Sequence, residues 1–385
     1  MTESNGDNGQ LQDVAAAVTQ REIYEHTLRY FFRFVEEHLD DATVSEIMIN
    51  GPREVYIERQ GRVEKSPLSF PGHEALYASV KNLAQYVGRV LTPDVARFDA
   101  RLPDGSRVHV TLPPCSRNGI CIAIRKFSNV NFTVADLVSR DSISEEGAEF
   151  LRICVLMEKN MLVSGGTGSG KTSLLNALSG FIPSTDRILV LEDSSELRMQ
   201  QEHVLYYEAV SGDKHGKGRV TIRDLFHSAL RMRPTRVVIG EIRGGEALDL
   251  LQAMTSGHSG SMSTIHANTP KDALNRLETL ALMGGLDLPL RAIRTQVASA
   301  IDVIVQISRF RDGSRRLVEI AEVLDLDPQG NYQTRPMYVF ELEGRPTKSK
   351  VEGVMRWTGN LPTFAEELRA LGYSDEVNLT RQLFD

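Results

Sequence analysis

A glycine-rich stretch in the middle of the chain has the residue types and spacing of a phosphate-binding loop. It follows an apolar segment, precedes a helical pattern and fits the motif G-x-x-x-x-G-K-[ST]. Glycines let the backbone curl so that successive N–H groups point at an anion, and the start of the helix adds a partial positive charge there. Lys171 supplies a mobile cation for the outer phosphates, and the Thr172 hydroxyl is a ligand for Mg²⁺. The stretch therefore predicts a nucleotide site made of Gly165, Gly166, Thr167, Gly168, Ser169, Gly170, Lys171, Thr172 and Ser173.

Two later apolar segments end in carboxylates that could act on a metal ion or a water molecule. Residues 188–191 run into Glu192-Asp193, and residues 237–239 run into Gly240-Glu241. Groups at the carboxyl ends of parallel strands meet in one crevice, so we expect Glu192 and Glu241 beside the phosphates. Glu241 stands where a Walker B strand usually has aspartate, and its extra methylene lets it reach a water as well as the metal shell. The alternative is that each carboxylate only caps the helix that follows.

Two histidines lie in a segment of small residues, Gly257 to Asn268. His266 follows a strand-like stretch that is aimed at the same crevice, where an imidazole could sense a γ-phosphate or a water. The alternative is a histidine that only makes structural hydrogen bonds.

The segments around these motifs alternate between strand and helix patterns, which predicts a largely parallel sheet covered on both faces. Ser142 with Glu145 resembles a capping box that opens a helix toward Met157. The tail predicts a strand pair and a final helix. The other expected elements are strands at 161–163, 188–191 and 237–239, a helix after residue 171, a helix around 291–299, and a hairpin over 302–324 that turns at 311–314.

The first 130 residues predict a mixed α/β domain around a modest sheet. Apolar residues from Tyr24 to Leu39 recur at spacings of three and four, as on one buried helix face. Strands are expected at 44–50, 54–59 and 119–127, with a helix around 76–87 and a hairpin over 100–112. We expect a disordered segment at 1–20, an N-terminal α/β domain at 21–128, a linker at 129–142, and a P-loop domain with C-terminal hairpins and a helix at 143–385.

The composition is that of a soluble globular protein. The chain has 385 residues, 41% hydrophobic and 25% charged, which fits two or three domains. A net charge of −7 argues against broad binding to nucleic acid. No apolar run approaches the roughly 20 residues of a membrane span, and the N-terminus lacks the pattern of a secretory signal. Three cysteines without a CxxC pair indicate neither a zinc knuckle nor a disulfide framework, so we expect a cytoplasmic location.

Four motifs in order resemble the secretion and pilus-motor ATPases of type II and type IV secretion and type IV pili. Besides the P-loop, they are an Asp box at 188–197, a Walker B motif at 233–247 and a His box at 257–268, and the resemblance covers residues 40–372. It implies an enzyme that hydrolyses ATP to ADP and phosphate, with Mg²⁺ as cofactor. By similarity, Lys171 and Thr172 hold phosphate and metal. Glu192 organises metal or water, Glu241 polarises the attacking water and binds near the metal, and His266 contacts the reacting phosphate.

The N-terminal region also resembles this family. Residues 46–64 resemble the family's N-terminal sheet, and residues 100–114 and 122–127 resemble the segment that brings arginines onto the nucleotide. By this similarity, Arg107 and Arg125 would neutralise charge on the transferring phosphoryl group, and Arg101 is a further candidate. The alternative is that they are surface arginines on a hairpin.

Residues 290–326 resemble the C-terminal part of the Tad-pilus and conjugative-type motors of the family rather than that of the retraction motors, and residues 354–372 also fit the Tad-pilus pattern. The resemblance implies a RecA-like C-terminal domain behind the N-terminal α/β domain and a ring-forming chain. It further implies a homo-hexameric cytoplasmic motor, peripheral at the inner face of the inner membrane, that acts on an inner-membrane platform protein without binding nucleic acid directly. The alternatives are a RecA-like motor that translocates nucleic acid and a nucleotide-gated scaffold for which hydrolysis is not essential.

Overall fold

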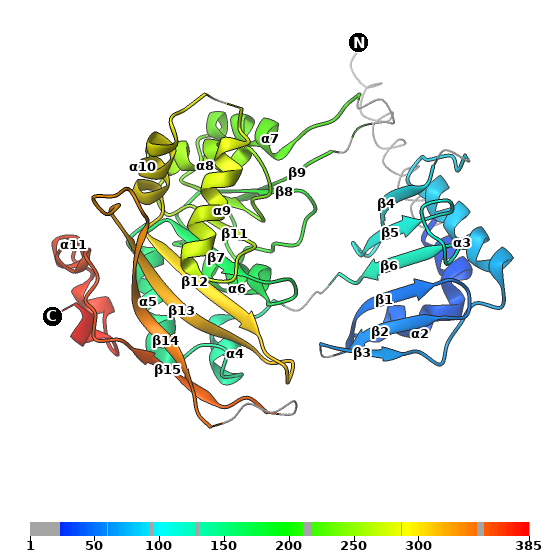
Figure 1. The fold of residues 1–385 in the computed structure, drawn as a ribbon, viewed down its shortest axis with the longest axis horizontal. Helices are drawn as coiled ribbons and strands as arrows, with labels where there is room; N and C mark the ends of the chain where they lie inside the picture. The colour runs from blue at the N-terminus through cyan, green and yellow to red at the C-terminus, as the bar shows by residue number, and fades with distance from the viewer. Residues whose placement is uncertain are drawn as a thin grey trace, which may run out of the picture. The chain divides into compact units, whose positions relative to one another are not determined.

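Two sheets organise the chain, one in each of the units Met1–Asn129 and Val130–Asp385 (Figure 1). The computed structural model describes residues 24–59, 61–92, 95–127, 131–210, 212, 217–285, 287–344 and 350–384, and the structural statements below refer to these residues. The segment 1–20, which the sequence predicts to be disordered, lies outside them.

The N-terminal unit is built on a six-stranded antiparallel sheet with the order β3-β2-β1-β6-β5-β4. Apolar side chains from the helical residues 24–32, η1 (Arg33–Val35) and α3 (His73–Tyr86) bury one face of the sheet. Because successive side chains of a strand point to opposite faces, the residues between the buried ones lie on the other face, where they are half-buried or exposed. The strands are β1 (Val44–Asn50), β2 (Val55–Arg59), β3 (Arg62–Lys65), β4 (Arg97–Arg101), β5 (Arg107–Thr111) and β6 (Cys121–Arg125), and a short helix α2 (Glu36–Asp40) precedes them.

Most elements predicted for this unit are present. The strand predicted at 44–50 coincides with β1, and the hairpin predicted over 100–112 joins β4 and β5, although β4 starts earlier, at Arg97. The strand β3 was not predicted, because all four of its residues are exposed and no apolar alternation marks them.

The second unit contains a nine-stranded sheet with the order β15-β14-β13-β12-β7-β11-β10-β8-β9. The six strands from β12 to β9 in this order pair in parallel, and β12 to β15 pair as antiparallel neighbours. The strands are β7 (Met161–Gly165), β8 (Ile188–Glu192), β9 (Val204–Glu208), β10 (Arg236–Ile239), β11 (Met262–Ile265), β12 (Val303–Arg309), β13 (Arg315–Leu324), β14 (Gln333–Leu342) and β15 (Gly353–Trp357).

Helices cover both faces of the parallel part, as the alternation of patterns predicted (Figure 1). One apolar core joins the sheet to α5 (Glu145–Leu156) and α6 (Lys171–Ser179). The other joins it to α7 (Ile222–Ala229), α8 (Glu246–Met254), α9 (Pro270–Leu282) and α10 (Leu290–Ala300). Strands β7, β8 and β10 are buried along their whole length, which is why they appear in the sequence as continuous apolar runs.

The segment before α5 differs from the expectation at two points. The cap of α5 is Ser144, whose side chain accepts a hydrogen bond from the backbone of Gly147, and not Ser142 paired with Glu145. The expected linker at 129–142 contains the helix α4 (Val134–Ser139), whose Val134 and Leu137 pack into the core of the second unit. These residues therefore belong to the packing of that unit.

The C-terminal residues are fastened to α5. The rings of Phe364 and Phe384 stack on Phe150, and Glu149 accepts backbone hydrogen bonds from residues 378–380. The short helix α11 (Ala365–Ala370) lies in this segment, in agreement with the predicted final helix. Within the described ranges, no helix combines the length and the apolar character needed to cross a bilayer.

A buried ion pair supports the start of β10. Arg236 is 1% exposed; its Nε donates to Asp186 Oδ2 at 2.6 Å and its Nη1 donates to the carbonyl of Val155 at 2.9 Å. Gly260 leaves room for this guanidinium, since an added Cβ there would lie 2.4 Å from Arg236 Nη1. The pair thus ties the sheet to the end of α5.

Arg236→Ala should lower the free energy of unfolding by about 3–5 kcal/mol, because Asp186 would stay buried without its partner. Urea denaturation measures this change. The control is Arg356→Ala, which breaks an ion pair with Glu341. The two side chains of this pair are 57% and 62% exposed, so its loss should lower the free energy of unfolding by less than about 1 kcal/mol. Equal small losses in both variants would contradict the role given to Arg236.

Candidate functional site

The phosphate loop connects the end of β7 at Gly165 to the start of α6 at Lys171, as predicted. Gly168 and Gly170 have φ of +68° and +95°, a left-handed conformation that side chains rarely adopt. Gly165 has no room for a side chain, since an added Cβ would lie 2.3 Å from the carbonyl oxygen of Ile307 on β12. Gly168 and Gly170 are therefore required by the backbone path, and Gly165 by the neighbouring strand.

Lys171 is folded back onto this loop. Its Nζ donates to the carbonyls of Gly165 at 3.0 Å and Gly166 at 2.9 Å, and it lies 3.3 Å from His266 Nδ1. The side chain of Ser169 is likewise turned inward and donates to the carbonyl of Gly166 at 2.9 Å. The half-buried Thr172 occupies the first turn of α6, directly after the loop. A positive charge and a hydroxyl thus lie together at the start of this helix.

The strand order brings the predicted residues to one edge of the sheet. Strand β11 pairs with β7 on one side and with β10 on the other, and β10 pairs with β8. Because these strands are parallel, their carboxyl ends meet at the same edge. The segments that follow the four strands carry the phosphate loop, His266, Glu241 and Asp193.

A chain of polar contacts runs across this edge. His266 Nε2 lies 3.0 Å from Glu241 Oε1, and Glu241 Oε2 accepts a hydrogen bond from Arg243 Nη2 at 2.8 Å. Arg243 Nη1 lies 3.6 Å from Asp193 Oδ2. Together with the contact between Lys171 and His266, these links join the P-loop, the His box, the Walker B motif and the Asp box. Sequence reasoning assigned no role to Arg243, although its position two residues after Glu241 was a usable signal.

The surroundings set the charges of this cluster. Burial alone would raise the pKa of Glu241, but the hydrogen bond from Arg243 and the positive charges of Arg243 and Lys171 outweigh it and lower the pKa. Burial, together with the nearby charge of Lys171, lowers the pKa of His266 against the opposing effect of Glu241. Glu241 is therefore ionised and His266 neutral near pH 7. A neutral ring that donates from Nε2 to Glu241 can accept from Lys171 at Nδ1.

Glu192 lies at the same edge and makes hydrogen bonds to the backbone that follows it. Its Oε1 accepts from the N–H groups of Glu196 at 2.9 Å and Leu197 at 3.0 Å. The residue is 5% exposed, and Gly240 gives it space, since an added Cβ there would lie 2.9 Å from Glu192 Cγ. The next element after Glu192 is the strand β9, so this contact orders a loop and is not the helix cap that the alternative expected. The role of Glu192 toward metal or water stays a prediction.

The arginines of the N-terminal unit form a row across three strands. Arg101 on β4 is the register partner of Arg107 on β5, and Arg107 is the partner of Arg125 on β6. All three alternate with buried residues, so they lie on the face of the sheet opposite its apolar core. Guanidinium groups placed side by side suit an anion with several oxygen atoms. The row is therefore a candidate anion-binding surface.

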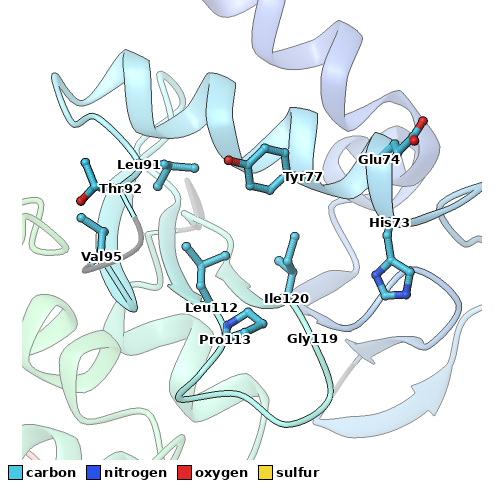
Figure 2. A pocket seen from close by; sticks show the side chains of 10 residues that line it. All are labelled: His73, Glu74, Tyr77, Leu91, Thr92, Val95, Leu112, Pro113, Gly119 and Ile120. Atoms are coloured by element: carbon cyan, nitrogen blue, oxygen red, sulfur yellow. The ribbon is translucent and has the colours of Figure 1, made fainter.

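The N-terminal unit also contains an apolar pocket of about 550 Å³ (Figure 2). Tyr77 of α3 lies over a floor that includes Leu112 and Ile120, and His73 lies at the side next to Gly119 (Figure 2). The residues that line the pocket include none of the predicted site residues. The concentration of charged contacts at the P-loop, rather than this pocket, marks the candidate functional site.

Comparison with known proteins agrees with the geometry of the second unit. The family model described as "Type II/IV secretion system protein" matches residues 32–332. The type IV secretion system protein PtlH of Bordetella pertussis is 36% identical over 315 residues, which cover 73% of this chain and 91% of PtlH. The conjugal transfer protein TrbB of Rhizobium radiobacter is 34% identical over 304 residues, which cover 77% of this chain and 88% of TrbB.

The crystal structure of the pilus retraction motor PilT with bound ADP has a similar fold. It aligns with a TM-score of 0.51 and 16% sequence identity, over 80% of this chain and 81% of PilT. The predicted architecture, an N-terminal mixed α/β domain followed by a RecA-like P-loop domain, is confirmed. Because the family model spans most of the chain and these relatives match it over most of their length, the chain belongs to the type II/IV secretion system protein family.

Proposed function

We propose that this chain is an ATPase that powers a type IV secretion or conjugation system. The observation that carries the proposal is the contact chain Lys171–His266–Glu241, which joins the cation of a phosphate loop to an ionised carboxylate at the edge of a parallel sheet. The names of the relatives PtlH and TrbB support secretion and conjugation as the processes served. The more specific assignment to Tad-pilus assembly stays a prediction from residues 290–326 and 354–372.

The residues at this edge fit a magnesium-bound nucleotide. The N–H groups of residues 165–173 would hold the phosphates. The Thr172 hydroxyl, together with Glu192 or Glu241, would bind Mg²⁺, which commonly takes one or two oxygen ligands from a protein beside phosphate oxygens. When bound, the metal would neutralise charge on the phosphates. Lys171 would exchange the carbonyls of Gly165 and Gly166 for phosphate oxygens, since both are oxygen acceptors within reach of the same side chain.

Glu241 would act as the group that orients and deprotonates the attacking water. Its ionised state suits this role, because only the carboxylate form can accept a proton. His266 would keep Glu241 in place through Nε2. A hydrogen bond from Nδ1 to the reacting phosphate would need a proton on that nitrogen, which the negative charge of a bound phosphate would favour once Lys171 moves away. Arg243 holds the other oxygen of Glu241, which fixes the direction of the carboxylate.

Arg107 and Arg125 would bind the terminal phosphate from the N-terminal unit. Their alignment on neighbouring strands presents two guanidinium groups together, which suits an anion with several oxygens. Loss of the γ-phosphate would remove the anion that these arginines hold, so hydrolysis would change what this sheet binds. Arg101, in register with Arg107, would add to the same surface.

The chain would work as a homo-hexameric ring at the inner face of the inner membrane, acting on a platform protein of the secretion machine. These points rest on the family resemblance. The cytoplasmic location and the absence of direct nucleic-acid binding are likewise proposals, and the net charge of −7 supports the second of them.

Glu241→Gln should lower ATP turnover by at least about 100-fold, because an amide cannot accept the proton of the attacking water. ADP affinity should stay within about twofold, since Glu241 does not hold the shared phosphates. Steady-state phosphate release and calorimetric ADP titration measure the two quantities. Lys171→Ala is the contrasting variant and should lose ADP affinity. Normal turnover in Glu241→Gln would remove this residue from the mechanism.

Arg107→Ala and Arg125→Ala should each lower turnover far more than ADP affinity. The expected fall in turnover is about 10³-fold, as for an arginine that acts on the γ-phosphate. The matched control is Arg117→Ala, on the exposed loop between β5 and β6. Turnover and ADP binding are measured for all three variants. Parallel losses of turnover and ADP affinity would show that these arginines act on the nucleotide as a whole.

With a non-hydrolysable ATP analogue and Mg²⁺, the protein should have six times the 42.9 kDa mass of one chain. Size-exclusion chromatography with light scattering measures this mass, because it does not depend on molecular shape. A mass that remains that of one chain would refute the ring.

A further inference from the structure

The hairpin of β12 and β13 contacts the phosphate loop through two arginines. Arg315, the first residue of β13, donates from Nε to the carbonyl of Gly168 at 2.9 Å. Its stem covers Gly170, where an added Cβ would lie 3.2 Å from Arg315 Cδ. Arg309, the register partner of Arg315, lies against the same loop, with Nη1 3.2 Å from an added Cβ on Gly168.

The hairpin is itself a firm support. Strand β12 pairs in parallel with β7, the strand that leads into the loop, with Ile307 opposite Gly165. At the turn, Asp312 accepts hydrogen bonds from the backbone and hydroxyl of Ser314, at 2.9 and 2.6 Å, and from the backbone of Val351 at 2.8 Å. Arg315 therefore stands at the start of a strand whose partner β12 pairs with the strand that leads into the loop, next to a turn tied by Asp312.

This contact acts on the part of the loop that would hold the phosphates common to ATP and ADP. The N–H groups of such a loop point inward at the α- and β-phosphates, which leaves carbonyls such as that of Gly168 for donors on the outside. A guanidinium bound to this carbonyl fixes the orientation of the peptide and keeps the loop in its anion-binding shape. Without it, the loop would have to be ordered by the ligand, and ligand affinity would fall.

We propose that Arg315 is a positioning residue that holds the phosphate loop in its nucleotide-binding conformation through the carbonyl of Gly168. The inference rests on the proposed function, because it needs a nucleotide at this loop. It assigns to the β12–β13 hairpin a role that the four sequence motifs do not include. Since Arg315 acts on the site of the shared phosphates, its effect falls on binding and leaves the chemistry of the γ-phosphate unchanged.

The test compares Arg315→Ala and Arg315→Met with the exposed control Arg311→Ala at the turn of the same hairpin. The methionine variant keeps most of the apolar stem but has no hydrogen-bond donor. Both Arg315 variants should raise the calorimetric Kd for ADP and the KM for ATP by about tenfold, as expected for loss of a charged hydrogen bond. The kcat should stay within about twofold, because the lost interaction would stabilise the bound substrate and the transition state equally. Arg311→Ala should match the unaltered protein, and thermal melting shows whether each variant is folded.

An unchanged Kd in Arg315→Ala would overturn the proposal. A normal Kd in Arg315→Met would also overturn it, since packing of the stem alone would then be sufficient, and this variant decides the matter if the alanine variant does not fold. A kcat that falls as much as affinity would show that Arg315 acts on the reaction itself. If the unaltered chain fails to bind ADP, the proposed function fails, whatever the hairpin does.

Discussion

The candidate site depends on one side chain, the imidazole of His266, which bridges the cation of the phosphate loop and the carboxylate after β10. Its two ring nitrogens lie 3.3 Å from Lys171 Nζ and 3.0 Å from Glu241 Oε1. The three residues come together because β11 lies between β7 and β10 in a parallel sheet. A different strand order would leave a loop, a base and a bridging ring in separate places.

Burial and pairing oppose each other within this cluster, and their balance gives each group a different charge. Removal from water disfavours the charged form of both Glu241 and His266. For Glu241, the hydrogen bond and charge of Arg243 outweigh burial, so the carboxylate stays ionised. For His266, burial and the charge of Lys171 act in the same direction, so the ring stays neutral. A base and a neutral hydrogen-bonding group thus result from the same environment, and perturbed pKa values of this kind are concentrated at functional sites.

The phosphate loop is shaped from two sides by elements that have no phosphate-binding motif of their own. Strand β12 comes so close to Gly165 that only glycine fits there, and Arg315 of β13 holds the carbonyl of Gly168. In the N-terminal unit, strand register alone collects Arg101, Arg107 and Arg125 into a row. In both units the positions of the charged groups follow from β-sheet pairing, which is rigid enough to hold them.

The sequence by itself determined the elements and the residue types that their local physics requires. Glycines of the loop are recognisable because positive φ is costly for other residues, and buried strands such as β8 and β10 are recognisable as short apolar runs. It did not reveal the exposed strand β3 or the cap at Ser144, where the local pattern was absent or ambiguous. Only the tertiary structure decided that Glu192 holds the backbone of Glu196 and Leu197, that Arg243 holds Glu241, and that Arg315 reaches Gly168. The contact of Arg315 joins residues 147 positions apart. Its formation depends on strand order and register, which no local pattern of residues encodes.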